Sequence, residues 1–251
     1  MDLGIEGRVA LVMGASSGIG RGIAEALARE GARVALVSRS RDRLEQAVAG
    51  IAGEPLTLEA DTDDLERMAA LPDEVAQRFG APVEILVTNT GGPPAGGARE
   101  RTTEEWEAAY RSLVLAPRAL IESALPGMRE RGWGRIVNVG STSTIEVIPH
   151  LGLSNVHRLA AIGYFKTLAG ELAGDGITVN TVATGKIATD RIATLSGSLE
   201  AAEQMAREQV PAGRLGTPAE YGDLVAFLCS ARAAYICGAT IPIDGALLRA
   251  I

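Results

Sequence analysis

The chain has 251 residues, of which 47% are apolar and 22% charged, and it carries a net charge of −7 at pH 7. This length suits one large domain with a substantial core, and the negative charge together with 4% aromatic residues argues against a protein that binds nucleic acids. Two cysteines, Cys229 and Cys237, are too few for a metal site or a disulfide framework, so we expect no metal.

Short apolar runs alternate along the chain with longer amphipathic segments. We expect strands over 8–13, 33–37, 56–60, 84–87, 135–139, 178–182 and 240–243, and helices over 18–29, 41–51, 65–78, 103–131, 154–174 and 218–230. Near-continuous Val, Ile and Leu strands that alternate with helices are typical of a parallel sheet covered on both faces. The pattern predicts an α/β fold, a single domain over 1–251 with a Rossmann-type, doubly wound parallel sheet of about seven strands. Residues 188–212 carry no strong strand signal, and we expect them to form a mobile helical lid.

A glycine-rich turn follows the first expected strand and leads into a helix. The free N–H groups and the positive dipole end of a helix start suit a pyrophosphate, and glycines let the backbone approach it closely. We interpret the turn as a dinucleotide site, with an unliganded tight turn as the alternative. The residues expected to hold the cofactor here are Gly14, Ser16, Ser17, Gly18, Ile19 and Gly20.

The second expected strand leads into Ser38 and Arg39. A carboxylate is expected at this place when the adenosine ribose has free hydroxyls, because it accepts their hydrogen bonds. Arg39 instead offers a positive charge and a planar fork of donors that suit a 2′-phosphate, to which the hydroxyls of Ser38 and Ser16 add donors. We therefore expect NADP(H) rather than NAD(H). The alternative is a solvated Arg39 that binds no ligand.

Several ordered motifs resemble those of the short-chain dehydrogenase/reductase family over essentially the whole chain, and the 3-oxoacyl-acyl-carrier-protein reductases are its nearest familiar members. The turn over 14–20 resembles the family's cofactor turn, residues 88–91 its Asn-Asn-Ala-Gly stretch, and residues 138–141 the strand that delivers the active-site serine. Residues 180–189 resemble the segment that holds the nicotinamide carboxamide, with Thr184 in place of proline, and residues 213–220 and 243–245 resemble C-terminal signatures. The resemblance implies further cofactor contacts from Asp61, at the adenine, and from Asn89, Gly91, Ile187 and Thr189.

The family's catalytic residues carry over only in part. In the family a serine orients the carbonyl, a tyrosine about thirteen residues further on exchanges the proton, and a lysine four residues beyond lowers the pKa of the tyrosine. The resemblance puts Ser141, Ser154 and Arg158 at these three positions, and the family's catalytic asparagine falls near Ser112 or Leu113. The four tyrosines, Tyr110, Tyr164, Tyr221 and Tyr235, are followed four residues later by Val114, Leu168, Val225 and Ala239, so the sequence has no Tyr-x-x-x-Lys.

Ser154 and Arg158 are one helical turn apart, so both can face the same cleft. Arg158 can bind ribose hydroxyls and stabilise an oxyanion, and Ser154 can orient a substrate or a water, but neither is a good acid. His157, His150 and Lys186 are alternative groups for the site. Tyr164 lies on another face of the helix and is interpreted as a core or interface residue.

We expect an NADP(H)-dependent oxidoreductase with an altered proton relay, in which Ser141, Ser154 and Arg158 act on a small carbonyl or alcohol, a 3-oxoacyl thioester among the candidates. The alternative is a catalytically impaired sensor or scaffold that binds nucleotide. No secretory signal and no run of about 18 apolar residues occurs, which favours a cytoplasmic protein without a membrane span. We expect further copies of the chain as partners, in a homotetramer or homodimer, and no nucleic acid.

Overall fold

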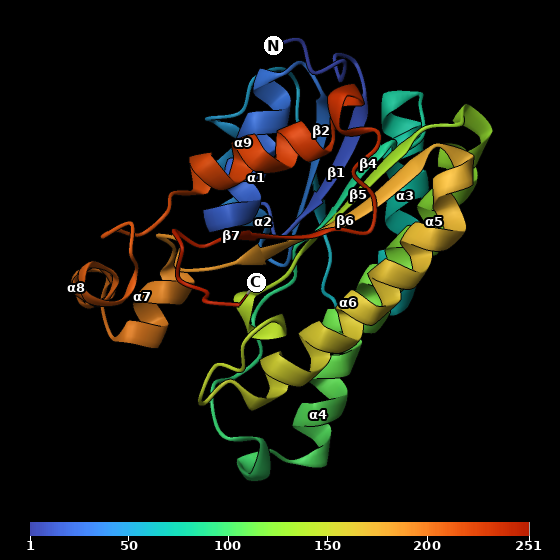
Figure 1. Cartoon of the computed structure of the whole chain (residues 1–251). Coiled ribbons are helices and arrows are strands. Elements are labelled where there is room, and N and C mark those ends of the chain that lie inside the picture. The colour runs from blue at the N-terminus through green and yellow to red at the C-terminus, as the bar shows by residue number, and fades with distance from the viewer. Residues whose placement is uncertain (251) are drawn as a thin grey trace.

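Seven parallel strands form one sheet in the order β3-β2-β1-β4-β5-β6-β7 (Figure 1). The computed structural model, which describes residues 1–250, gives the strands as β1 Val9–Met13, β2 Arg33–Ser38, β3 Leu56–Glu59, β4 Ile85–Thr88, β5 Gly134–Val139, β6 Ile177–Thr184 and β7 Thr240–Ile243. The strand order changes direction between β1 and β4, which makes this pair the switch point of a doubly wound sheet. The predicted fold class is confirmed.

Helices cover both faces of this sheet (Figure 1). One face carries α1 (Gly18–Arg29), α2 (Arg41–Val48) and α9 (Pro218–Leu228), and the other carries α3 (Leu65–Phe79), α5 (Ala116–Arg131) and α6 (Gly152–Leu172). α4 (Thr103–Tyr110) continues through a π-helical turn, Arg111–Leu115, into α5. α7 (Asp190–Ser196) and α8 (Leu199–Gln209) occupy the segment after β6. Single 3₁₀ turns lie at Ala98–Glu100, Thr142–Thr144, Ala173–Asp175 and Ala231–Ala233.

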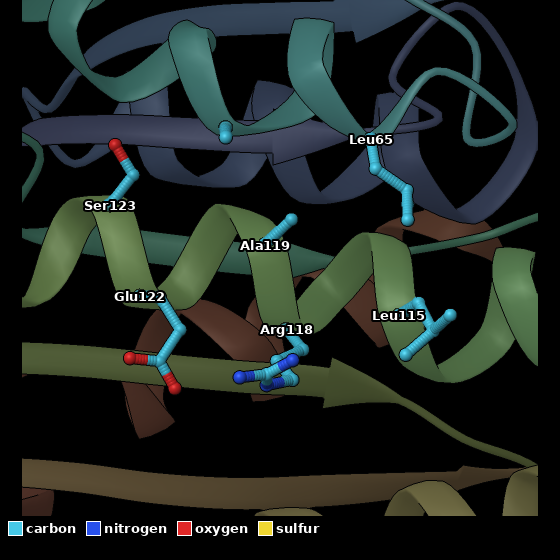
Figure 2. Close-up of a pocket in the computed structure, with 7 residues that line it drawn as sticks. Leu65, Leu115, Arg118, Ala119, Glu122 and Ser123 are labelled. Carbon is cyan, nitrogen blue, oxygen red and sulfur yellow. The ribbon is translucent and has the colours of Figure 1, made fainter.

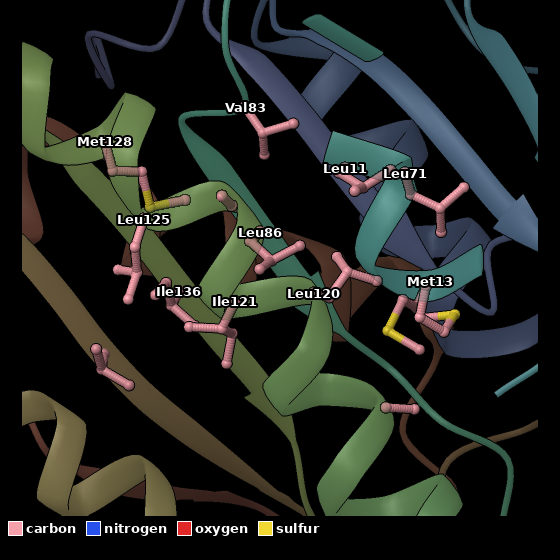
Figure 3. Packing of buried hydrophobic residues seen from close by; sticks show 14 of the residues in the cluster. Leu11, Met13, Leu71, Val83, Leu86, Leu120, Ile121, Leu125, Met128 and Ile136 are labelled. Carbon is pink, nitrogen blue, oxygen red and sulfur yellow. The ribbon is translucent and has the colours of Figure 1, made fainter. Parts of the chain in front are cut away.

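The core consists of two apolar layers because consecutive side chains of a strand point to opposite faces. In β1, Leu11 and Met13 belong to the layer under α3 and α5, whereas Ala10 and Val12 belong to the layer under α1 and α9. Figure 3 shows Leu11 and Met13 packed with side chains of α3 and α5. The central strands β1 and β4 are therefore buried on both faces, which explains why their sequences are mostly apolar rather than alternating.

The carboxyl ends of the parallel strands meet at one edge of the sheet, as the expected topology requires. The loops after β1, β2, β4, β5 and β6 leave from this edge, so residues far apart in the sequence come together there. Within residues 1–250 no helix combines the length and the apolar character that a membrane crossing demands.

Candidate active site

The turn between β1 and α1 is shaped by glycines at the switch point of the sheet. Gly14 and Gly18 have φ angles of +59° and +52°, which L residues with a side chain rarely adopt. A Cβ on Gly20 would lie 2.2 Å from the carbonyl oxygen of Gly14, so the chain closes too tightly there for any side chain. Asn89, just after β4, donates from Nδ2 to the same carbonyl oxygen at 3.5 Å. The sequence-predicted residues Gly14, Gly18, Gly20 and Asn89 thus lie together.

The start of α1 keeps its backbone N–H groups free of a side-chain cap. Ser17 occupies the N-cap position with extended backbone, and its side chain makes no capping hydrogen bond. Within residues 1–250, six other α-helices are capped by a side-chain oxygen, those of Ser40, Asp64, Thr102, Thr189, Ser198 and Thr217. Uncapped amides at a helix start, next to a turn without side chains, form a cradle for a diphosphate. The residues of this turn therefore fit a dinucleotide.

Three predicted contacts of the 2′-phosphate lie next to this cradle. The hydroxyls of Ser16 and Ser38 are hydrogen-bonded to each other at 2.9 Å. The side chain of Arg39 is 76% exposed, and its Nη1 lies 3.9 Å from a carboxylate oxygen of Asp61. An ion pair this long and exposed contributes little, so the guanidinium group is available to a ligand. Asp61 also accepts a hydrogen bond from the backbone N–H of Asp63 at 3.1 Å.

Ser141 follows directly on the end of β5. Its Oγ accepts a hydrogen bond from the backbone N–H of Ser143 at 3.1 Å, and its carbonyl oxygen accepts one from Thr144 Oγ1 at 2.7 Å. Because Oγ acts as the acceptor in this turn, the O–H of Ser141 remains free to donate. Ser141 is thus held as a hydrogen-bond donor at the sheet edge.

Arg158 reaches the same strand end from α6. Its Nη1 donates to the carbonyl oxygen of Val139, the last residue of β5, at 2.8 Å. Burial lowers the pKa of Arg158 to about 10, which leaves it protonated at neutral pH. Ser154, one turn earlier on α6, is only 6% exposed. The first two turns of α6 bond through the side chains of Asn155, His157 and Arg158, whereas Ser154 makes no side-chain hydrogen bond within residues 1–250.

His157 turns away from this group. Its Nδ1 lies 2.8 Å from the carbonyl oxygen of Leu153, and its ring packs against Trp106 at 5.1 Å and Tyr110 at 6.3 Å between centroids. The imidazole is therefore buried against α4. As an alternative proton donor in the cleft, His157 is excluded by its packing.

Lys186 and His150 also take up other contacts. Lys186 donates from Nζ to Met205 Sδ at 2.7 Å and to Gln209 Oε1 at 3.1 Å, both on α8. It therefore ties the loop after β6 to α8. His150 lies exposed in the loop before α6, and its carbonyl oxygen accepts a hydrogen bond from the backbone N–H of Gly96.

The position expected for the family's asparagine lies in the π-helical turn between α4 and α5. Ser112 accepts a hydrogen bond from Thr62 Oγ1 at 3.1 Å, and Leu113 is buried in the core. Ser112 thus connects this π-helical turn to the loop after β3. Neither side chain provides the amide that the family uses there.

Tyr221 is a residue of this region that the sequence reasoning missed. It is fully buried on α9, and its hydroxyl lies 2.9 Å from Thr184 Oγ1 and donates to the carbonyl oxygen of Val182 at 3.2 Å. Burial raises the pKa of Tyr221 well above its ordinary value, so it stays a neutral phenol. Tyr221 therefore braces the end of β6, ahead of Ile187 and Thr189. Tyr164, as predicted, packs against the core beside Phe165.

Arg191 is the second residue that the sequence reasoning missed. It lies in the first turn of α7, two positions after Thr189, and its Nη2 donates to the carbonyl oxygen of Pro93 at 2.8 Å. Its positive charge also contributes to lowering the pKa of Arg158. The sequence signal that could have indicated Arg191 is a basic residue two positions after the end of the predicted nicotinamide segment.

A groove of 460 Å³ opens elsewhere, between α3 and α5 (Figure 2). Its lining includes Leu65, Leu115, Arg118, Glu122 and Ser123, and none of the candidate catalytic residues. The groove is therefore separate from the residues gathered at the strand ends.

Comparisons with known proteins match the chain over nearly its whole length. The family model described as Enoyl-(Acyl carrier protein) reductase matches residues 14–247. The 3-oxoacyl-acyl-carrier-protein reductase FabG of Vibrio cholerae is 37% identical over 247 residues, which cover 98% of this chain and 99% of that protein. Human Dehydrogenase/reductase SDR family member 4 is 36% identical over 245 residues, covering 95% and 86% of the two chains.

Two solved structures show the same architecture. L-sorbose reductase from Gluconobacter frateurii, crystallised with NADPH and L-sorbose, superposes with a TM-score of 0.94 at 33% identity and covers 100% of both chains. YwfH, an NADPH dependent reductase involved in bacilysin biosynthesis, superposes with a TM-score of 0.91 at 28% identity and covers 98% of this chain and 100% of its own.

Proposed function

Because the chain belongs to the short-chain dehydrogenase/reductase family, we propose that it is an NADP(H)-dependent oxidoreductase that interconverts a small carbonyl compound and its alcohol. The observation that carries this proposal is the uncapped, glycine-shaped start of α1 with Ser16, Ser38 and Arg39 beside it. The NADPH bound to L-sorbose reductase supports the choice of cofactor, and the likeness to FabG makes 3-oxoacyl thioesters candidate substrates.

The chain offers a contact for each part of the dinucleotide, whose nicotinamide ring, when bound, donates or accepts the hydride. The amides at the start of α1 hold the diphosphate, and Ser16, Ser38 and Arg39 hold the 2′-phosphate. Asp61 would accept a hydrogen bond from the amino group of the adenine. The remaining contacts, toward the nicotinamide half, come from Asn89, Gly91, Arg158, Ile187 and Thr189.

Three residues act on the substrate oxygen in this proposal. Ser141 donates a hydrogen bond to it, and the charge of Arg158 stabilises the negative charge that develops there in reduction. Hydride addition at the carbonyl carbon leaves an alkoxide, which takes its proton from a water held by Ser154 and releases hydroxide to solvent. In the oxidation direction the alcohol gives its proton to a hydroxide ion at the same place, which becomes water. The proton therefore moves without a tyrosine.

The segment with α7 and α8 is part of the same proposal. Its apolar side chains form a small cluster of their own, Ala202, Ala206, Val210 and Leu215, apart from the two layers of the sheet. Such a separate unit can move without disturbing the core. We assign it the role of a lid that closes over the bound substrate.

The experiment that tests the proposed function measures NADPH consumption against a panel of carbonyl compounds that includes 3-oxoacyl thioesters. We expect turnover with at least one of them, and a loss of about 100-fold in kcat/KM for Ser141→Ala because one donor to the substrate oxygen is removed. Thr144→Ser, a conservative change in the same turn, is the control. Tight NADPH binding without any turnover would favour the sensor or scaffold that the absence of Tyr-x-x-x-Lys leaves open.

A further inference from the structure

Two arginines at the strand ends have no acidic partner. Most ion pairs of the protein join an arginine to a carboxylate on the surface, but within residues 1–250 no carboxylate oxygen lies within 4.0 Å of Arg158 or Arg191. Each guanidinium group instead donates one hydrogen bond to a backbone carbonyl. A guanidinium group has five N–H donors, so most of those on both residues remain for a ligand.

The two carbonyls that anchor these arginines lie at the end of one strand and in the loop after its neighbour. Val139 ends β5, and Pro93 lies in the loop that follows β4, the strand hydrogen-bonded to β5. Arg158 approaches from α6 and Arg191 from α7, so the two charges come from two different helices. Ser141 lies two residues beyond Val139. Arg158 is therefore bonded two residues away from Ser141, which contacts the substrate oxygen in the proposed function.

Gly92 leaves room for the guanidinium group of Arg191 to lie against the backbone. A Cβ built on Gly92 would lie 2.8 Å from Nη2, 2.9 Å from Cζ and 2.9 Å from Nε of Arg191. Three atoms of one planar group at equal distance mean that the plane lies flat on the backbone of Gly92. A side chain at position 92 would displace it. Arg191 thus occupies the space that the missing side chain of Gly92 leaves in the loop after β4.

The two guanidinium groups of Arg158 and Arg191 repel each other when no anion lies between them. Burial lowers the pKa of both arginines, and the charge of Arg191 lowers that of Arg158 further. The protein as a whole carries −7, so carboxylates are plentiful, yet none within residues 1–250 pairs with either group. An anion that enters between them offsets this cost and finds two forks of donors.

We propose that Arg158 and Arg191 bind an anionic group of the substrate, so that the substrate is a carbonyl compound that also carries a carboxylate. This assignment rests on the proposed function, which places the carbonyl group beside Ser141. Arg191 then determines specificity, since it selects acids over neutral compounds of the same size.

The diphosphate of the cofactor is a second source of the same chemistry, since Arg191 follows Thr189 closely. The two sources are separated by measuring NADPH and the substrate independently. The probes are pyruvate, acetoacetate and levulinate, each compared with its own methyl ester, and their binding to the NADP⁺-loaded protein is measured by calorimetry. NADPH binding is measured by fluorescence.

We expect at least one acid to bind at least tenfold more tightly than its ester, and Arg191→Gln to remove this preference while the Kd for NADPH stays within twofold. Gly92→Ala should also weaken the binding of the acid, because it displaces the guanidinium group. Arg191→Lys should keep part of the affinity for the acid that Arg191→Gln removes. Two controls make the same chemical changes elsewhere. Arg99→Gln removes an exposed charge, and Gly163→Ala adds a Cβ that meets no atom within 4 Å.

Equal affinities for every acid and its ester would overturn the assignment. It would also be overturned if Arg191→Gln weakened the binding of NADPH as much as it weakened the binding of the acid. The latter result would assign Arg191 to the cofactor. Because binding is measured without turnover, a failure of the anion site can be distinguished from a failure of the proposed function. Selective binding of an acid with no reduction of any carbonyl would leave the anion site standing and contradict only the oxidoreductase.

Discussion

Arginines carry the chemistry of this site at the scale of single residues. Arg39 lies exposed at the end of β2, Arg158 is anchored to the end of β5, and Arg191 lies flat on Gly92. A guanidinium group keeps its charge where a lysine would lose it, and its planar fork suits phosphate and carboxylate groups. In the proposed function, these properties would let a site without Tyr-x-x-x-Lys bind two anionic ligands and stabilise negative charge on oxygen.

Arg39→Ala tests the cofactor preference at this scale. We expect the Kd for NADPH to rise about tenfold or more, because one charge-assisted contact to the 2′-phosphate is lost, and the Kd for NADH to stay unchanged. Fluorescence titration measures both constants. Arg41→Ala is the matched control, since Arg41 pairs with Glu45 on the surface of α2. An equal effect on NADPH and NADH would contradict the role given to Arg39.

The helices and strands show which structural features the sequence patterns predict and which they do not. The strands and most helices follow from apolar periodicity, since burial on both faces demands it. β6 extends to Thr184, beyond the predicted end at Val182, because its last residues pair with β7 rather than bury large side chains. α2 ends at Val48 instead of Ile51, and the π-helical turn at Arg111–Leu115 interrupts a helix predicted as uninterrupted, since local propensity does not encode either feature.

The candidate site likewise contains features that the sequence predicts and contacts that it does not. The turn over 14–20 could be predicted because glycine spacing and a following helix are local features. The burial of His157 against Trp106 depends on how α6 packs on α4, and the contact of Arg191 with Pro93 joins residues 98 positions apart. Spacing along one helix does not determine such tertiary contacts. The sequence therefore indicated the cofactor side of the site better than the substrate side.

Tyr221→Phe tests the link between α9 and β6. Removing the phenol oxygen leaves Thr184 without its hydroxyl partner, so we expect the free energy of unfolding to fall by about 1–2 kcal/mol. Urea denaturation measures it. Tyr235→Phe removes the same atom from a side chain that is 102% exposed and should change nothing. Equal stability of the two variants would show that the buried hydroxyl does not brace the end of β6.

The whole molecule combines a sheet that is packed on both faces with several arginines at the edge where the strands end. Its two apolar layers fix the strand ends, whereas α7 and α8 project together at one side and pack through a small cluster of their own (Figure 1). Arg39, Arg158 and Arg191 add positive charge at the strand ends, although the chain as a whole carries −7. A negatively charged cofactor and a negatively charged substrate can therefore both be drawn to the same edge.

A crystal structure of the chain with NADPH tests the central claim most directly. The account predicts the diphosphate on the amides at the start of α1, the 2′-phosphate between Ser16, Ser38 and Arg39, and Ser141 beside the nicotinamide ring with no tyrosine near it. A dinucleotide bound at another place, or a tyrosine hydroxyl in hydrogen-bonding reach of the substrate position over that ring, would contradict the account.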